Sequence, residues 1–414
     1  SIQTTKENEI LTTSHLKDIF ITGLVGEDGD VLPFTNPIQC EQNIDEWVPN
    51  LFTSMKEATK EEFVTALSKL TSTNLDDWII TVTSYIAILT THVSFTRDIE
   101  DCLNNLEINP KGFLVYQNAV KQKMQDLVNI MTKPLSSAEL MKVSSLLTTV
   151  IFQFEKTRMF HDSIHHISPE RIYHDMMKFK YDAKASNITI QFRENIWIHG
   201  NEFWGKANPL IITPSIEHAM LNMYQARVYD QVSLLFGPFG VGKTELIRTF
   251  ASTLGYFIYS AAAFPSFERY FCTQVLTGAA LSGSWVLFSE IEQLSSASIS
   301  FLFDSVRSIN DATITKSTYC NVNGEMVKLN QNTRIFFSSS LDSYINGKLP
   351  PHLRNYVRPI SLSAPLVRKI VETKLLITGY KTIREISTKL DEFVTAIIPL
   401  FNLTQSRLQH CLRI

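Results

Sequence analysis

Residues 237 to 244 read Gly-Pro-Phe-Gly-Val-Gly-Lys-Thr, a complete phosphate-binding pattern of the form G-x-x-x-x-G-K-[ST]. The apolar run from Val232 to Phe236 precedes this pattern, and an amphipathic stretch containing Leu246 and Phe250 follows it. Such a context predicts a strand, a tight loop and a helix, whose backbone N–H groups and helix dipole attract phosphate. Three of the 15 glycines of the chain fall within this loop, so the pattern does not reflect a glycine-rich composition. The sequence therefore predicts a nucleoside triphosphate site.

Each residue type in the loop has its own task at such a site. The glycines let the backbone approach the phosphates, Lys243 is expected to reach the outer phosphates, and Thr244 is expected to offer its hydroxyl to Mg²⁺. The predicted cofactors are ATP or ADP with Mg²⁺, and Thr244 is the predicted metal ligand. The loop residues expected to bind the nucleotide are Gly237, Pro238, Phe239, Gly240, Val241, Gly242, Lys243 and Thr244.

The distribution of apolar residues predicts the fold class. Short apolar segments alternate with helical stretches, which predicts an α/β unit with a parallel sheet and crossover helices. The chain from about 52 to 180 is poor in Pro and Gly and carries apolar residues at helical spacing. Asp28-Gly29 between apolar pairs predicts a hairpin near residues 20–35. The predicted strands of the sheet are 232–236, 256–260, 285–288 and 335–338.

Composition argues against several classes of partner. A net charge of −3 gives no basic field, so no nucleic-acid partner is expected. The five cysteines form no C-x-x-C pair, which favours a reducing compartment. The longest apolar run, 78–89, is too short to cross a bilayer, so no membrane partner is expected. Because the sequence starts with Ser1 rather than Met, we expect a piece of a longer protein.

Hydrolysis needs an acidic strand end that holds Mg²⁺ and a carboxylate that activates the attacking water. The predicted strand at 285–288 continues into Ser289 and Glu290. Glu290 can act as the general base, whereas Ser289 brings no charge to the metal. The strand at 335–338 continues to Ser340, a short hydroxyl where an amide would orient the water better. We therefore predict nucleotide binding with impaired hydrolysis, with Glu290 and Ser340 as catalytic candidates; alternatively, Glu290 only caps the helix that follows.

Several segments spread over most of the chain resemble dynein heavy chains, in the C-terminal part of the linker and the first AAA+ module of the motor. The resemblance implies a mostly helical linker part at 1–205, an AAA+ large α/β subdomain at 206–360 and the start of the small helical subdomain at 361–414. It also implies that Ile211, Ile212, Thr213 and Pro214 cradle adenine and that Glu245 belongs to the nucleotide site. The segments that carry the resemblance are 29–32, 43–48, 200–205, 210–214, 237–245, 283–294, 349–354, 358–359 and 379–380.

The chain departs from the family pattern at the hydrolytic positions. Ser289 stands where the family's hydrolytic module has Asp, Ser340 where it has Asn, and Ile345-Asn346 where it has Gly-Arg. The arginine of the small subdomain has only a weak counterpart, Arg407. These departures indicate a divergent member with weakened hydrolysis.

The resemblance implies an ATP-binding motor fragment in which the nucleotide state drives linker movement for microtubule-based motility. The implied partners are neighbouring AAA+ modules of the same heavy chain, microtubules through a stalk, and dynein intermediate and light chains through a tail. The implied location is the cytoplasm and cytoskeleton, or the axoneme of a cilium or flagellum. Two alternatives stay open: a dynein-related scaffold that binds nucleotide without hydrolysing it, and an unrelated phosphate-loop ATPase with an N-terminal partner-binding domain.

Overall fold

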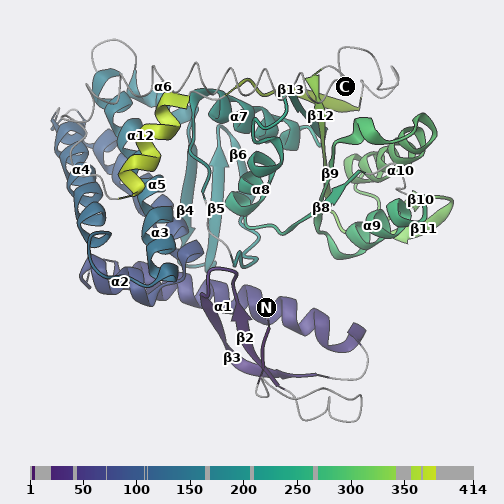
Figure 1. Cartoon of the computed structure of the whole chain (residues 1–414), viewed down its shortest axis with the longest axis horizontal. Helices are drawn as coiled ribbons and strands as arrows, with labels where there is room; N and C mark the ends of the chain where they lie inside the picture. The colour runs from purple at the N-terminus through teal and green to yellow at the C-terminus, as the bar shows by residue number, and fades with distance from the viewer. Residues whose placement is uncertain are drawn as a thin grey trace.

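The computed structural model describes most of the chain, with elements named as in Figure 1. The described residues are 2–4, 20–40, 44–70, 72–106, 108–109, 111–163, 168–205, 209–263, 269–341, 356–364 and 367–378.

A five-stranded parallel sheet carries the phosphate-loop sequence. Its strand order is β13-β7-β12-β9-β8, and every neighbouring pair is parallel. This order places β7, which leads into the loop, between β12 and β13. The strands are β7 (Val232–Gly237), β8 (Ile258–Ala262), β9 (Trp285–Ser289), β12 (Arg334–Ser340) and β13 (Val357–Ser361).

Helices cover both faces of this sheet, because successive strand residues point to opposite faces. Leu235 and Phe336 pack in one core with α7 and α8, whereas Leu234 and Phe337 pack in a second core with α9 and α10. The predicted α/β fold with a parallel sheet and flanking helices is confirmed. The helices are α7 (Pro214–Val228), α8 (Lys243–Leu254), α9 (Arg269–Ser282) and α10 (Ser296–Ile314), and a hairpin of β10 (Tyr319–Val322) and β11 (Glu325–Lys328) follows α10.

The residues before this unit form helices and two antiparallel sheets. β1–β3 lie beside α1, and β4–β6 lie between the helices α3 and α5 and the helices α7 and α8 (Figure 1). The segment 188–192, in which apolar and polar residues alternate, lies in the strand β5. The helical prediction was wrong at 177–180, because β4 pairs with β5 along its whole length, a non-local contact that helical spacing does not reveal. The elements are β1 (Ile2–Thr4), β2 (Phe20–Val25), β3 (Val31–Gln39), α1 (Ile44–Lys69), α2 (Leu75–Thr81), α3 (Ser84–Asn104), α4 (Gly112–Ile130), α5 (Ser137–Ser163), α6 (Pro169–His174), β4 (Met177–Asp182), β5 (Asn187–Phe192) and β6 (Asn195–Ile198).

The hairpin predicted at Asp28-Gly29 is confirmed by the turn between β2 and β3. Gly29 has a φ of 79°, and the N–H of Gly26 donates to the carbonyl of Asp30 at 2.7 Å. The carboxylate of Asp30 is buried, accepts from Ser84 N at 2.7 Å and pairs with Lys142 Nζ at 2.7 Å. These contacts fix the turn to α3 and α5.

One hydrophobic core continues from the helical part into the sheet with the phosphate loop. Leu147 of α5, Ile190 of β5 and Leu235 of β7 are fully buried members of the same cluster. The helices before residue 205 are therefore packed against the α/β unit through the β4–β6 sheet.

Two strands of the parallel sheet differ from the prediction. β8 begins at Ile258 rather than at residue 256, and β13 was not predicted as a strand. Pro359 argues against a central strand, but β13 lies at the sheet edge, where a missing N–H is tolerated.

A last described helix, α12 (Val367–Ile377), follows β13. The segments 345–346, 349–354 and 379–380, with Arg407, lie outside the described residues. Among the helices of the described ranges, none is long and apolar enough to cross a membrane.

Candidate nucleotide site

The loop between β7 and α8 has the geometry of a phosphate cradle. Gly240 and Gly242 have φ values of 76° and 90°, in the left-handed region that glycine adopts without steric cost. A Cβ built on either glycine meets no heavy atom within 4 Å, so the space beside the loop is open. The loop leads directly into the N-terminus of α8 at Lys243. Open space beside backbone N–H groups at a helix N-terminus fits a phosphate.

Gly237 is required by a different contact. A Cβ at this position would lie 2.3 Å from the carbonyl oxygen of Leu362, which follows β13. The backbone just after β13 therefore approaches the start of the loop too closely for any side chain.

Lys243 folds back over the loop. Its ammonium donates to the carbonyl oxygens of Gly237 at 2.9 Å and Pro238 at 2.8 Å. Burial lowers the pKa of Lys243, and the carboxylates of Glu292 and Glu290 oppose this shift. The cation is thus held at the mouth of the loop with two carboxylates within electrostatic range.

The sheet register brings the hydrolytic candidates to the same edge as the loop. Ser340, the last residue of β12, lies opposite Gly237 of β7, and Phe337 of β12 lies opposite Phe288 of β9. Because parallel strands end at one edge, Ser289 and Glu290 follow β9 on the side of the sheet that carries the loop. The serine and glutamate predicted as one site therefore lie along a common edge.

Glu290 has a constrained backbone and an exposed side chain. Its φ of 56° is left-handed, which is uncommon for a residue other than glycine. Its N–H donates to Ser338 Oγ at 3.4 Å, and its carboxylate accepts from the amide of Gln293. Glu290 is the N-cap residue of the short 3₁₀ turn that follows it, without a side-chain cap hydrogen bond, whereas Ser295 Oγ caps α10 by accepting from Ser298 N.

A second carboxylate at this edge was missed by the sequence reasoning. Glu292 lies in the short 3₁₀ turn η2 (Ile291–Gln293), and its Oε1 accepts from Ser340 N at 2.8 Å. Its Oε2 is buried and has no hydrogen-bond partner among the described residues. The only sequence signal was a second acid two residues after Glu290.

The segment predicted to hold adenine lies at the start of α7. Thr213 is the N-cap residue and Pro214 the first helical residue, which is the position that proline favours. Ile212 and Glu245 both line one large cavity, but none of the loop residues 237–244 lines it. The structure thus brings Ile212 and Glu245 together and leaves the adenine contact a prediction.

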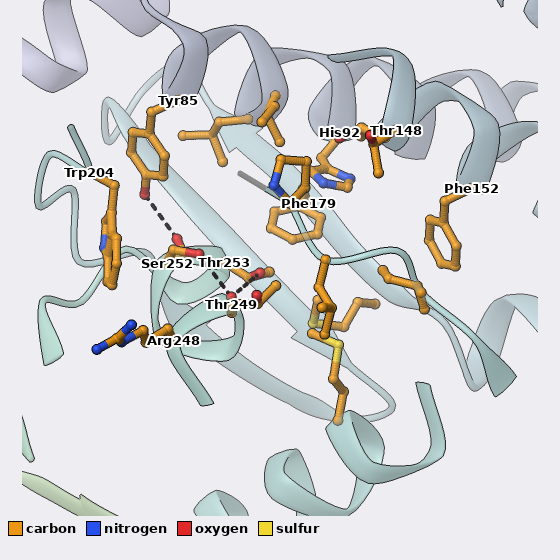
Figure 2. A pocket seen from close by; sticks show the side chains of 18 of the residues that line it. Tyr85, His92, Thr148, Phe152, Phe179, Trp204, Arg248, Thr249, Ser252 and Thr253 are labelled. Carbon is orange, nitrogen blue, oxygen red and sulfur yellow. Dashed lines mark hydrogen bonds between the residues drawn. The ribbon is translucent and has the colours of Figure 1, made fainter. Parts of the chain in front are cut away.

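This cavity, of about 830 Å³, separates the helical part from α8. Figure 2 shows Thr148 and Phe152 of α5, with Tyr85 and His92 of α3, on one side and residues of α8 on the other. Tyr85 reaches across and donates to the carbonyl of Ser252 in α8 at 3.1 Å. The helical part and α8 are therefore joined here by a specific polar contact beside incompletely packed space.

A parallel sheet with a phosphate loop between a central strand and its helix defines an α/β nucleotide-binding protein of the phosphate-loop class. Residues 199–409 match the family described as the hydrolytic ATP binding site of the dynein motor region. The chain belongs to this family, and the hypothesis of an unrelated phosphate-loop ATPase is thereby wrong.

Curated relatives extend the similarity over nearly the whole chain. Cytoplasmic dynein 2 heavy chain 1 of Rattus norvegicus is 24% identical over 97% of this chain and 10% of that protein. The cytoplasmic dynein heavy chain of Dictyostelium discoideum is 22% identical over 94% of this chain and 8% of that protein. Human dynein axonemal heavy chain 9 is 20% identical over 89% of this chain and 8% of that protein. The chain spans about a tenth or less of the length of these relatives, and the low identities mark it as divergent.

Among solved structures, a mutant RuvB of Thermotoga maritima is 20% identical, with a TM-score of 0.29, over 38% of this chain and 48% of that chain.

Proposed function

We propose that the loop 237–244 binds ATP or ADP together with Mg²⁺. The observation that carries this proposal is the open, left-handed backbone at Gly240 and Gly242 beside the start of α8. Lys243 would turn from the loop carbonyls to the outer phosphates, and Thr244 would offer its hydroxyl to the metal. Mg²⁺ bound there would draw charge away from the terminal phosphate.

We further propose that hydrolysis is weakened. Ser289 follows the buried part of β9 and carries no charge to hold the metal through water, as a carboxylate would. The backbone N–H of Ser340 is already bound by Glu292, and its side chain is short and buried. Glu290 remains the proposed general base, although its exposed carboxylate is engaged by Gln293.

The proposed coupling between nucleotide and linker runs through α8. This helix begins at Lys243 in the phosphate loop, and its last turn accepts the hydrogen bond of Tyr85. A shift of α8 on nucleotide binding would reach α3 directly. On its cavity side, α8 lacks close-packed neighbours that would oppose such a shift, since close packing is what makes interiors stiff.

In the whole protein, we propose that this module works beside neighbouring AAA+ modules and serves microtubule-based motility. The relatives named as cytoplasmic and axonemal dyneins support a place on the cytoskeleton, in the cytoplasm or in an axoneme. Microtubules would be bound through a stalk, and intermediate and light chains through a tail, as the dynein resemblance implies.

The second candidate is a dynein-related scaffold in which the nucleotide is structural or regulatory. Ser289 and Ser340 favour this candidate, because position 289 lacks the expected carboxylate and position 340 lacks the expected amide.

Single-turnover ATP hydrolysis by the complete ring, with and without Ser289→Asp, separates the two candidates. A weakened motor is expected to turn over slowly and to gain rate, about tenfold or more, from the restored carboxylate. The scaffold is expected to show no turnover in the wild type. Fast turnover without the substitution contradicts both the scaffold and the weakened site.

A further inference from the structure

We propose that Glu292 makes this phosphate site prefer a nucleoside diphosphate over a triphosphate. The inference rests on the proposed function, namely that the loop 237–244 holds an adenine nucleotide.

A backbone hydrogen bond at the carboxyl end of the parallel sheet fixes the position of the Glu292 carboxylate. Its Oε1 accepts from Ser340 N at 2.8 Å, and Ser340 lies directly opposite Gly237 in the parallel ladder. Gly237 is the first residue of the phosphate loop. The carboxylate is thus anchored where β12 and β7 end, beside the loop.

The second oxygen of Glu292, Oε2, is buried and accepts no hydrogen bond from the described part of the chain. An ionised oxygen in such a place keeps its charge unscreened by water, which strengthens its effect on neighbouring charges. Glu290 differs, because its side chain is exposed and the amide of Gln293 binds it.

Lys243 meets the same end of the sheet as Glu292. Its ammonium donates to the carbonyl oxygen of Gly237 at 2.9 Å, and Gly237 lies opposite Ser340, whose N–H donates to Glu292. The ammonium of Lys243 is also the group that reaches the outer phosphates in a loop of this kind. A terminal phosphate drawn toward Lys243 therefore comes within range of Glu292.

The consequence differs between the two nucleotides. Loop N–H groups and the α8 dipole neutralise the inner phosphates, which both nucleotides possess. Only a triphosphate places an additional doubly charged group near Glu292. Ser289 provides no carboxylate to hold Mg²⁺ there, so less metal charge offsets the repulsion. The diphosphate is favoured as a result.

Calorimetric titration of the 414-residue chain with ADP and with the non-hydrolysable triphosphate AMPPNP, both in excess Mg²⁺, tests the inference. Wild type is expected to bind ADP about tenfold or more tightly than AMPPNP. Glu292→Gln, which keeps an acceptor for Ser340 N, is expected to tighten AMPPNP binding by about tenfold and to leave ADP binding within about twofold. Glu325→Gln, in the exposed hairpin β10–β11, is the matched control and is expected to change neither affinity.

Three results would overturn the inference: equal wild-type affinities, an equal change for both nucleotides in Glu292→Gln, or weaker AMPPNP binding in that variant. The wild-type ratio tests the inference even if the variant fails to fold. Wild type that binds neither nucleotide instead contradicts the proposed function, so the two failures are distinguishable.

Discussion

The hydroxyl of Tyr85 in α3 donates a 3.1 Å hydrogen bond to the carbonyl oxygen of Ser252, near the far end of the helix that begins at the phosphate loop. His199 Nε2 lies 3.0 Å from the same hydroxyl. Because a carbonyl oxygen can only accept, the hydroxyl proton goes to Ser252, and Nε2–H of a neutral His199 donates to the Tyr85 oxygen. Three segments distant in sequence therefore meet in one buried chain of hydrogen bonds.

Tyr85→Phe is expected to loosen this connection without removing the nucleotide site. The variant leaves the ring N–H of His199 without its partner and removes one of two hydrogen bonds to the Ser252 carbonyl, which still accepts from Gly255 N at 3.0 Å. The free energy of unfolding should therefore fall by about 1–2 kcal/mol. Amide hydrogen exchange in the last turn of α8 should accelerate, while ADP affinity should stay within about threefold. Tyr229→Phe, at a tyrosine that is 66% exposed, serves as the control. Unchanged exchange in α8 argues against the coupling path.

The stability of the fold should decrease in mild acid because of His199. This residue is 2% exposed, and burial lowers its pKa to about 4, whereas the unfolded chain has a histidine pKa of about 6.5. Between these values the unfolded state binds a proton that the folded state does not. The contribution of the neutral His199 ring to the free energy of unfolding is therefore complete above about pH 6.5. It declines by up to about 1.4 kcal/mol per pH unit down to about pH 4. Urea unfolding of wild type and His199→Gln across this pH range measures the effect on the free energy of unfolding. If the free energy of unfolding depends on pH in the same way in both proteins, the pH dependence does not come from His199.

Lys243→Ala should abolish nucleotide binding, because the loop loses its only formal positive charge at the outer phosphates. The expected loss of ADP affinity by calorimetry is about a hundredfold or more. Lys328→Ala, on β11 away from the loop, is expected to bind as the wild type does. An unchanged affinity in Lys243→Ala would show that nucleotide binds elsewhere.

Gly237→Ala should destabilise the carboxyl end of the parallel sheet, where β7 meets the backbone that follows β13. The added methyl would lie 2.3 Å from the backbone oxygen of Leu362, so β7 and the residue after β13 must separate. We expect a loss of about 1–3 kcal/mol in the free energy of unfolding. Gly278→Ala in α9, where a Cβ meets nothing within 4 Å, should instead stabilise by about 0.5–1 kcal/mol. Equal effects of the two substitutions would refute the close approach.

The features that could be predicted from the sequence are those determined by short stretches of the chain. The phosphate loop, the hairpin at Gly29 and four strands of the sheet each depend on neighbouring residues. β13 was missed because Pro359 is tolerated only at an edge, and edge position is set by the other strands. Likewise, Glu292 reaches the site through Ser340 N, 48 positions later in the chain. Such long-range pairings are invisible to local patterns.

The central claim is an intact phosphate cradle in a site with weakened hydrolysis. The most direct measurement mixes the chain with a slight excess of γ-labelled ATP and follows bound nucleotide and released phosphate in the same sample. We predict close to one nucleotide per chain, exchange on a measurable timescale and phosphate release slower than that exchange. Phosphate release faster than nucleotide exchange, or no bound nucleotide at all, would contradict the account.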